Sequence, residues 1–201
     1  MKPLLEDIIK TKILVLDGAM GTMIQKLKLQ EADYCGKEFA DHPKPQKGNN
    51  DLLTLTNPDA IKNIHRQYLE AGADIITSNT FNSNKISMAD YGMENQVYRL
   101  NVEAVKNARE TIDDFEKSSG TTGHFIAGTL GPTNRTASMS SDVSDPGARS
   151  VTFDNLVEAY SEQARGLIDG GADILLVETI LTSSTARLLS LPSILSLRKK
   201  V

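Results

Sequence analysis

The sequence predicts an α/β fold with a parallel sheet, and three observations support this prediction. Four short aliphatic runs have the length of buried strands: residues 13–16, 75–78, 125–127 and 174–177. Their apolar residues are consecutive rather than alternating, which is typical of parallel strands covered by helices. Stripes of apolar residues at helical spacing lie between the runs, so strands and helices alternate along the chain.

The first helix is predicted to begin at Pro58. Asn57 is suited to cap a helix, Pro58 fits the first turn, and Asp59 favours the positive end of the helix dipole. Gly72 then provides a stop in the left-handed conformation. Between them, the apolar residues at helical spacing are Ile61, Ile64, Tyr68 and Leu69.

Two further stripes predict helices over residues 97–115 and 153–168. The last of these ends at Gly170 and Gly171. Residues 71–76 resemble residues 170–175, because in both a glycine stop and an Ala-Asp pair lead from a long helix into a strand. Repeated use of one such turn fits a (βα) barrel, and an open doubly wound sheet could use it too.

Composition excludes several classes of protein. A chain of 201 residues with 39% hydrophobic side chains fits one globular domain. A net charge of −4 argues against a surface that neutralises nucleic acid or anionic lipid. No apolar run approaches the ~18 residues that a membrane helix needs, and acids near the N-terminus argue against a signal peptide. We therefore expect a cytoplasmic protein with no nucleic-acid or membrane partner.

Two long polar segments, residues 28–56 and 129–150, are expected to form loops near the site. The only cysteine, Cys35, lies in the first of them and permits no intrachain disulfide. We expect Cys35 to be a free, non-catalytic thiol. His65 accompanies the first helical stripe, so we expect it to pack a helix.

Polar residues follow the predicted strands where each strand ends. Asp17 and Gly18 follow the first run, Asn79 and Thr80 the second, and Glu178 the fourth. Ligands of parallel α/β folds bind at the carboxyl ends of the strands. Two carboxylates there suit the ammonium of a small zwitterion, while backbone N–H groups and hydroxyls suit its carboxylate.

A purely structural interpretation of these residues also stays open. Asp17 could cap a glycine-stabilised turn, and Asn79 and Thr80 could serve only to form a turn. The glycines after the first run do not match G-x-G-x-x-G, and the chain lacks G-x-x-x-x-G-K-[ST]. Dinucleotide-binding and P-loop sites are therefore disfavoured.

Six ordered blocks between about residues 13 and 180 resemble the N-terminal homocysteine-binding module of cobalamin-dependent methionine synthase. They are ILVLDGAMGTMIQ, KGNNDLLTLTNPDAI, AGADIITSNTFNSN, ADYG, AGTLGPTNRT and TFDNLVEAYSEQARGLIDGGADILLVETI. The resemblance implies an incomplete (βα)8 TIM-type barrel, with the first four βα units present. It implies homocysteine as the substrate, with its amino group held by Asp17 and Glu178 and its carboxylate near Gly18. Asn79 is expected in the same site.

The resemblance also implies a reaction and its cofactors. The family transfers a methyl group, from methylcobalamin or methyltetrahydrofolate, to homocysteine and so gives methionine. Its zinc ion is held by three cysteines, in G-x-N-C and C-C motifs, and keeps the substrate sulfur as a thiolate. Neither motif occurs here, and Cys35 matches neither. We therefore expect neither zinc nor cobalamin in this chain by itself.

The resemblance ends near residue 180. We expect residues 1–180 to form the N-terminal half of a homocysteine-binding barrel and residues 181–201 a divergent tail, as in a truncated product. A half-barrel would expose two sheet edges, through which the chain could self-associate. Two alternatives to a methionine synthase module stay open. One is a metal-free barrel that binds another small ligand, and the other is a non-catalytic fragment or interaction protein.

Overall fold

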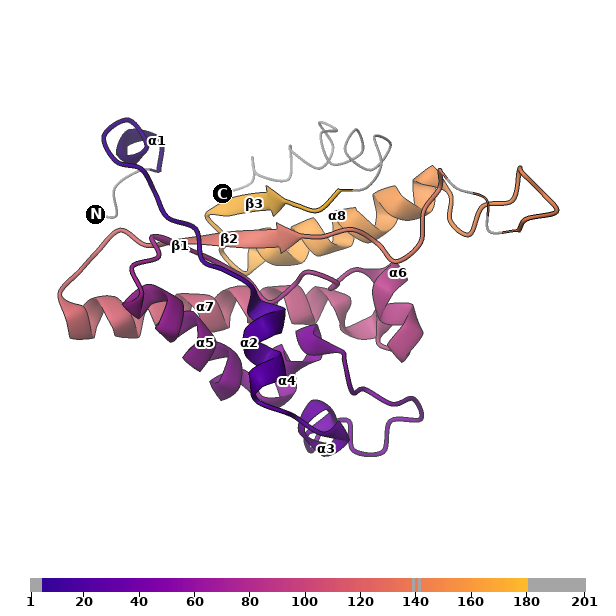
Figure 1. Ribbon diagram of the computed structural model, residues 1–201, viewed down its shortest axis with the longest axis horizontal. Coiled ribbons are helices and arrows are strands. Elements are labelled where there is room, and N and C mark those ends of the chain that lie inside the picture. The colour runs from indigo at the N-terminus through magenta and orange to yellow at the C-terminus, as the bar shows by residue number, and fades with distance from the viewer. Residues whose placement is uncertain (1–4, 139, 141, 181–201) are drawn as a thin grey trace.

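A computed structural model describes residues 5–138, 140 and 142–180 (Figure 1). Its centre is a parallel sheet in the order β1-β2-β3, formed by Ile75–Thr77, Phe125–Leu130 and Ile174–Val177. The predicted divergent tail, residues 181–201, lies outside the described residues. In the described part of the chain, no helix is long and apolar enough to cross a membrane.

The three long helices confirm the predicted stripes. They are α5 (Pro58–Glu70), α7 (Val97–Ser119) and α8 (Phe153–Asp169). Gly72 and Gly171 follow α5 and α8 with φ of 100° and 93°, which is the left-handed conformation predicted for the stops. The Asn57 side chain, however, makes no capping hydrogen bond. His65 is fully buried, as expected for a helix-packing residue.

Short helices occupy much of the segment that was predicted to be a loop. Within residues 28–56 the chain forms α3 (Glu31–Cys35), the 3-10 helix η1 (Asn50–Leu52) and α4 (Leu53–Thr56). Two short helices precede this segment, α1 (Leu5–Ile8) and α2 (Met20–Lys26). Three more lie between β1 and α7, namely α6 (Lys85–Met88), η2 (Ala89–Tyr91) and η3 (Glu94–Gln96). A capping box between Gln30 and Asp33 starts α3. Cys35 therefore ends a helix and is buried, and its Sγ lies 3.2 Å from Glu31 Oε1.

The first of the four predicted strands is not formed. Residues 13–16 make a single parallel bridge to the sheet, between Leu16 and Ile75. The amide of Asp17 donates to Ile75 O, and the amide of Ile75 donates to Val15 O. Within the described residues this segment pairs only with β1, and the side chain of Ile13 is 91% exposed rather than buried. The four segments nevertheless follow one another laterally in chain order, with residues 13–16 beside β1, β1 beside β2 and β2 beside β3.

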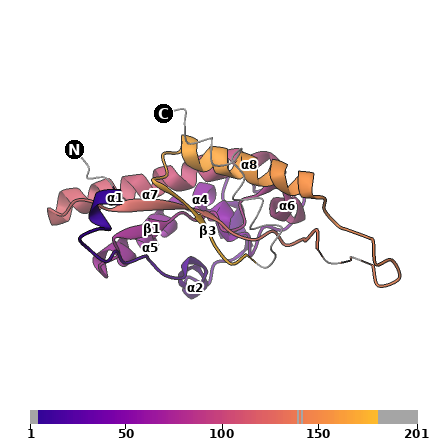
Figure 2. The ribbon, with the colours of Figure 1, turned by 90° about the horizontal axis from the view of Figure 1, so that it is seen from above.

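The main core lies between the sheet and the helices α7 and α8, which Figure 2 shows on one side of the strands. Ile76, Ile126 and Leu130 point into this core. A Cβ atom on Gly128 would meet Leu167 and Ala172 at 3.2 Å, so this position of β2 also faces α8. Because side chains alternate along a strand, the opposite face carries Thr77, Thr129 and Leu176.

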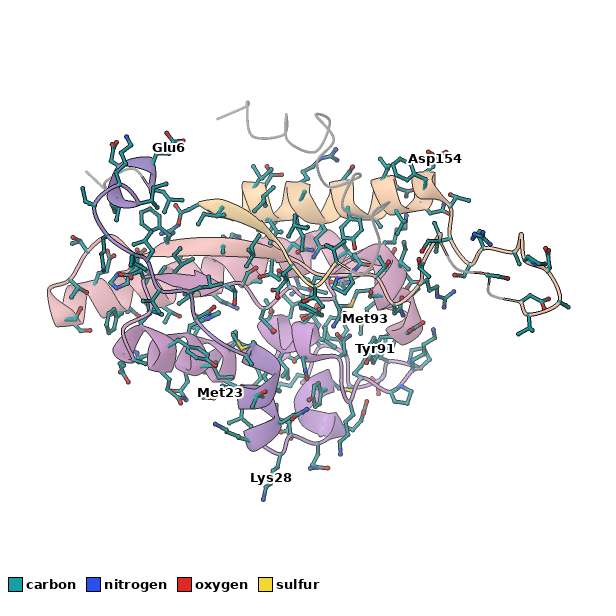
Figure 3. The ribbon with its side chains drawn as sticks, turned by 45° about the horizontal axis from the view of Figure 1, so that its top comes forward. Glu6, Met23, Lys28, Tyr91, Met93 and Asp154 are labelled. Atoms are coloured by element: carbon teal, nitrogen blue, oxygen red, sulfur yellow. The ribbon has the colours of Figure 1, made fainter. Side chains whose placement is uncertain are left out.

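A second, smaller core supports the segment from η1 to α7. Leu52, Met88, Met93, Val97 and Leu100 are buried together, with Tyr91 packed against them. Figure 3 labels Tyr91 and Met93 of this cluster. This cluster fixes η1 and α4 beside the loop that follows β1, and that loop forms part of the site.

Replacing Tyr160 by Phe is expected to lower the free energy of unfolding by about 1–2 kcal/mol, because a buried carbonyl loses its hydrogen bond. The Tyr160 hydroxyl donates to Gly131 O at 2.9 Å, at the point where β2 leads into the loop. Tyr98→Phe is the matched control, since the Tyr98 hydroxyl donates to Asp169 on the surface. Urea denaturation that finds equal losses for both variants would contradict this prediction.

Candidate functional site

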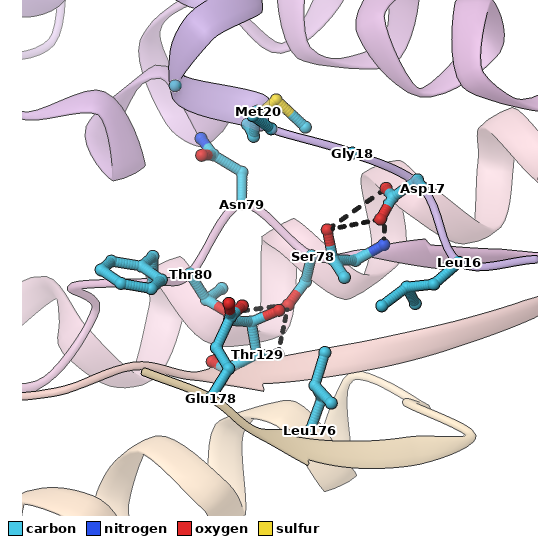
Figure 4. Close-up of a pocket in the computed structure, with 14 residues that line it drawn as sticks. Leu16, Asp17, Gly18, Met20, Ser78, Asn79, Thr80, Thr129, Leu176 and Glu178 are labelled. Carbon is cyan, nitrogen blue, oxygen red and sulfur yellow. Dashed lines mark hydrogen bonds between the residues drawn. The ribbon is translucent and has the colours of Figure 1, made fainter. Parts of the chain in front are cut away.

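All four residues predicted to form a site line one pocket at the carboxyl ends of the strands. Asp17, Gly18, Asn79 and Glu178 surround a cavity of about 340 Å³ (Figure 4). The remaining wall comes from the start of α2, from residues 77–81 and from the inward side chains of β2 and β3. The structure thus brings together residues that are up to 161 positions apart in the sequence, from Asp17 to Glu178.

The carboxylate of Asp17 is held in place by Thr77, the last residue of the neighbouring strand β1. Its Oδ2 accepts a hydrogen bond from the Thr77 amide at 2.8 Å, and its Oδ1 accepts one from the Thr77 hydroxyl at 3.0 Å. Burial raises the pKa of Asp17 to about 6, against the effect of these bonds, and the negative charge of Glu178 adds to the rise. A cation between the two carboxylates would remove this repulsion.

Hydroxyl groups on the pocket wall form a closed set of hydrogen bonds. Thr80 Oγ1 donates to Thr129 O at 2.8 Å, and the Thr129 amide donates to Ser78 Oγ at 3.0 Å. Ser78 Oγ and Thr80 Oγ1 lie 2.7 Å apart. Because the only hydroxyl proton of Thr80 is used on a carbonyl, Ser78 must donate to Thr80. The hydroxyl protons of Ser78 and Thr80 are therefore used within the protein.

Asn79 has a structural role in addition to its place on the pocket wall. Its Nδ2 donates to Asn50 O at 2.8 Å and lies 3.3 Å from Thr54 Oγ1. These contacts use both amide protons and hold the loop after β1 against η1 and α4. Only the side-chain oxygen of Asn79 is left for a ligand. The sequence left open whether Asn79 contacts a ligand or only forms a turn, and in this arrangement one residue can do both.

Gly18 keeps the backbone beside the pocket accessible. A Cβ atom there would lie 3.1 Å from the Tyr68 hydroxyl and 3.2 Å from its ring. A larger residue would therefore press on Tyr68, whose hydroxyl donates to Ala19 O. The glycine leaves the backbone between Asp17 and α2 uncovered by a side chain.

The donor set does not fit a zinc site of the three-cysteine kind. The whole sequence has one cysteine. Cys35 lies in α3 and is not part of the pocket wall. Among the described residues, no three His, Cys, Asp or Glu side chains form a group that could hold a metal ion.

Sequence reasoning missed two residues of this region. Thr129 was assigned to a loop, because the predicted strand ended at residue 127; β2 continues to Leu130, so Thr129 is an inward strand residue. Asp51 of η1 is buried, its Oδ2 accepts from the Asn82 amide at 2.7 Å, and burial raises its pKa to about 7. Nothing in its polar sequence neighbourhood distinguishes Asp51 from a loop residue.

Comparison with known proteins agrees with this architecture. The metallated form of the homocysteine methyltransferase MmuM from Escherichia coli matches with a TM-score of 0.68 and 22% sequence identity, over 92% of this chain and 60% of that chain. The oxidised form gives 0.71 and 21%, over 92% and 59%. The chain thus spans about three-fifths of the length of these structures. They are TIM-type barrels, so the predicted fold class, an incomplete (βα)8 barrel, is confirmed.

The match to a family model extends beyond residue 180 of the chain. The sequence model of a family described as homocysteine S-methyltransferase matches residues 14–198. The matched region contains β1, β2, β3 and all four residues of the predicted site. Since this match covers most of the 201 residues, the chain belongs to the homocysteine S-methyltransferase family.

Proposed function

We propose that this chain binds homocysteine in the pocket at the carboxyl ends of its strands. The ammonium of the amino acid lies between Asp17 and Glu178, and its carboxylate lies against the backbone at Gly18. One observation carries the proposal: two carboxyl groups from opposite sides of the sheet, Asp17 and Glu178, line one cavity of about 340 Å³. The family membership supports homocysteine as the ligand.

The proposed reaction is methyl transfer to the sulfur of homocysteine. A new sulfur–carbon bond forms as the bond between the methyl carbon and its donor breaks, and the thiol proton leaves. Within this reaction, the described residues bind and orient the amino-acid end of the substrate. The finer assignment is to the homocysteine-binding part of a methionine synthase, with methylcobalamin as the immediate methyl donor.

A binding function without catalysis is the second candidate, and the cysteine content favours it for the isolated chain. One cysteine cannot form the three-thiolate site that activates the substrate sulfur in the family. We therefore propose that this chain alone binds homocysteine and does not transfer a methyl group at a useful rate. A single cysteine also suits a reducing, cytoplasmic setting, which forms part of this proposal.

Isothermal titration with L-homocysteine at pH 7.5 under reducing conditions tests the binding proposal. The expected result is one site per chain with a Kd between about 1 μM and 1 mM, as is usual for small substrates. The control ligand is 4-mercaptobutanoic acid, which keeps the thiol and the carboxylate but lacks the amine. Equal affinity for both ligands, or no binding of homocysteine, would contradict the proposal.

A further inference from the structure

One buried hydroxyl on the pocket wall has no partner in the described part of the chain. It is Thr129 Oγ1, on a residue that is only 2% exposed. Thr129 lies in β2, on the face opposite Ile126 and Leu130, which point into the core beneath α7 and α8. Its side chain therefore points to the face that forms the pocket, and Thr129 is one of the residues that line the cavity.

The other hydroxyls of the pocket wall are already committed. Thr77 Oγ1 donates to the carboxylate of Asp17. Ser78 donates to Thr80, and Thr80 donates to the carbonyl of Thr129. As acceptors, Ser78 Oγ already receives the Thr129 amide and Thr80 Oγ1 receives the Ser78 hydroxyl, while Thr77 Oγ1 is tied to the Asp17 carboxylate itself. The Thr129 hydroxyl is the exception among the threonines and serines that line the cavity.

The position of Thr129 relates it to the two carboxylates. β2 lies between β3, which Glu178 follows, and β1, whose last residue Thr77 holds the carboxylate of Asp17. On one side its amide donates to Ser78 Oγ, beyond the end of β1. On the other side it is the register partner of Leu176, two residues before Glu178. Glu178 lies beside this part of β2, since its amide donates to Leu130 O, and Figure 4 labels Thr129 and Glu178 on the pocket wall.

We propose that Thr129 determines the specificity of this pocket for a ligand with a primary ammonium group. An ammonium has three N–H donors, and Asp17 and Glu178 accept two of them. Thr129 Oγ1 accepts the third. This inference rests on the proposed function, since it assigns a further contact to the same bound amino acid.

A buried hydroxyl without a partner destabilises the ligand-free protein, because it has lost its hydrogen bonds to water. In the ligand-free chain, the unpaired Thr129 hydroxyl therefore lowers the free energy of unfolding. A bound ammonium gives its oxygen a donor and so reduces this loss. A residue kept for packing alone would not need the hydroxyl, since valine has the same shape. This difference separates a role in ligand recognition from a role in stability.

The test compares Thr129→Val, which removes only the hydroxyl, with Thr129→Ser, which retains it. Titration with L-homocysteine is expected to show an affinity about 10-fold lower for Thr129→Val and within about 3-fold of the unmodified chain for Thr129→Ser, from the usual strength of a hydrogen bond to a charged group. Affinity for 4-mercaptobutanoic acid, which lacks the ammonium, is expected to be the same in all three proteins. Unchanged homocysteine affinity in Thr129→Val, or equal losses for both ligands, would overturn the contact.

Thermal unfolding without ligand gives an independent readout. Thr129→Val is expected to unfold at a Tm equal to or roughly 2–4 °C above that of the unmodified chain, since each kcal/mol shifts Tm by about that much at this size. A lower Tm for Thr129→Val would indicate a structural hydroxyl and overturn the inference. Absence of homocysteine binding by the unmodified chain would overturn the proposed function, and this contact with it. Normal binding that Thr129→Val does not change would overturn the contact alone.

Discussion

Asp17→Asn is expected to weaken homocysteine binding at pH 7.5 by roughly 100-fold. In the variant, the ligand ammonium donates to a neutral amide at position 17 instead of to a carboxylate, and a hydrogen bond between two charged groups is the stronger one. The amide oxygen of asparagine can still accept the 2.8 Å bond from the Thr77 amide, so the strand end stays in place. Isothermal titration measures the loss. The matched control is Asp114→Asn, which makes the same change on the exposed surface of α7, outside the pocket. Equal affinities for the two variants would contradict the two-carboxylate site.

The pH dependence of homocysteine affinity provides a second test of the role of Asp17. Burial, with a further contribution from Glu178, raises the pKa of Asp17 to about 6. Protonated Asp17 cannot pair with an ammonium, so the affinity for homocysteine is expected to fall as the pH decreases through 6. The Asp17→Asn variant should not show this fall. A flat affinity between pH 5 and 8 in the unmodified chain would count against an ionised Asp17 in the complex.

Stability is expected to change in the opposite direction to binding. The folded-state pKa of Asp17 lies above the ordinary value of 3.8, so its contribution to stability is complete below pH 3.8 and is lost as the pH rises through about 6. At pH 7.5 the ionised carboxylate therefore destabilises the ligand-free chain, on the order of 1–3 kcal/mol. Asp17→Asn should accordingly unfold at higher urea concentration than the unmodified chain. A variant that loses both binding and stability would indicate a purely structural Asp17.

Much of the fold could be predicted because the apolar residues of its helices follow the helical period. The stripes at 97–115 and 153–168 fall within α7 and α8, and the strands at 75–78 and 174–177 are found with small shifts. Gly72 and Gly171 could be placed because a left-handed helix stop strongly favours glycine. The site residues followed from one rule, that ligands bind where parallel strands end.

The differences have physical causes that a local sequence pattern does not contain. Residues 13–16 have the composition of a strand, but a strand needs a continuous ladder, and here a single bridge to Ile75 is formed. The helices η1 and α4 lie in a polar segment whose burial depends on distant partners, such as Tyr91 and Met93 for Leu52 of η1. The two amide protons of Asn79 and the hydroxyl protons of Ser78 and Thr80 are used across segments, which spacing along the chain cannot show.

Both edges of the sheet lack a full hydrogen-bonding partner among the described residues. β3 pairs with β2 on one side, and within the described residues no strand pairs with its other edge. Residues 13–16, at the opposite edge, contact the sheet through a single bridge. Val15 is 53% exposed and Val177 is 40% exposed, so both edges present aliphatic side chains to solvent. Unpaired strand edges of this kind favour association with another chain.

Geometry indicates how two copies would combine. Residues 13–16, β1, β2 and β3 follow one another laterally, and all neighbouring pairs are parallel. A two-fold axis along the strand direction would place β3 of one copy beside residues 13–16 of the other, with both segments running the same way. The second such contact would close a ring of eight segments, the number found in a TIM-type barrel. The pocket would then open into the enclosed interior, because Leu16 and Glu178 are on its wall at the two edges.

We therefore expect the purified chain to be a dimer or larger assembly that dissociates on dilution, as measured by size exclusion with light scattering. Val177→Lys should shift this equilibrium to the monomer by at least about 10-fold, since a buried unpaired charge at an edge costs more than 1.4 kcal/mol. Val143→Lys is the matched control, because Val143 is fully exposed, at 106%, on a loop away from the sheet. A monodisperse monomer at every concentration would refute edge pairing, and equal shifts for the two lysine variants would show that added charge, rather than the edge of β3, governs the association.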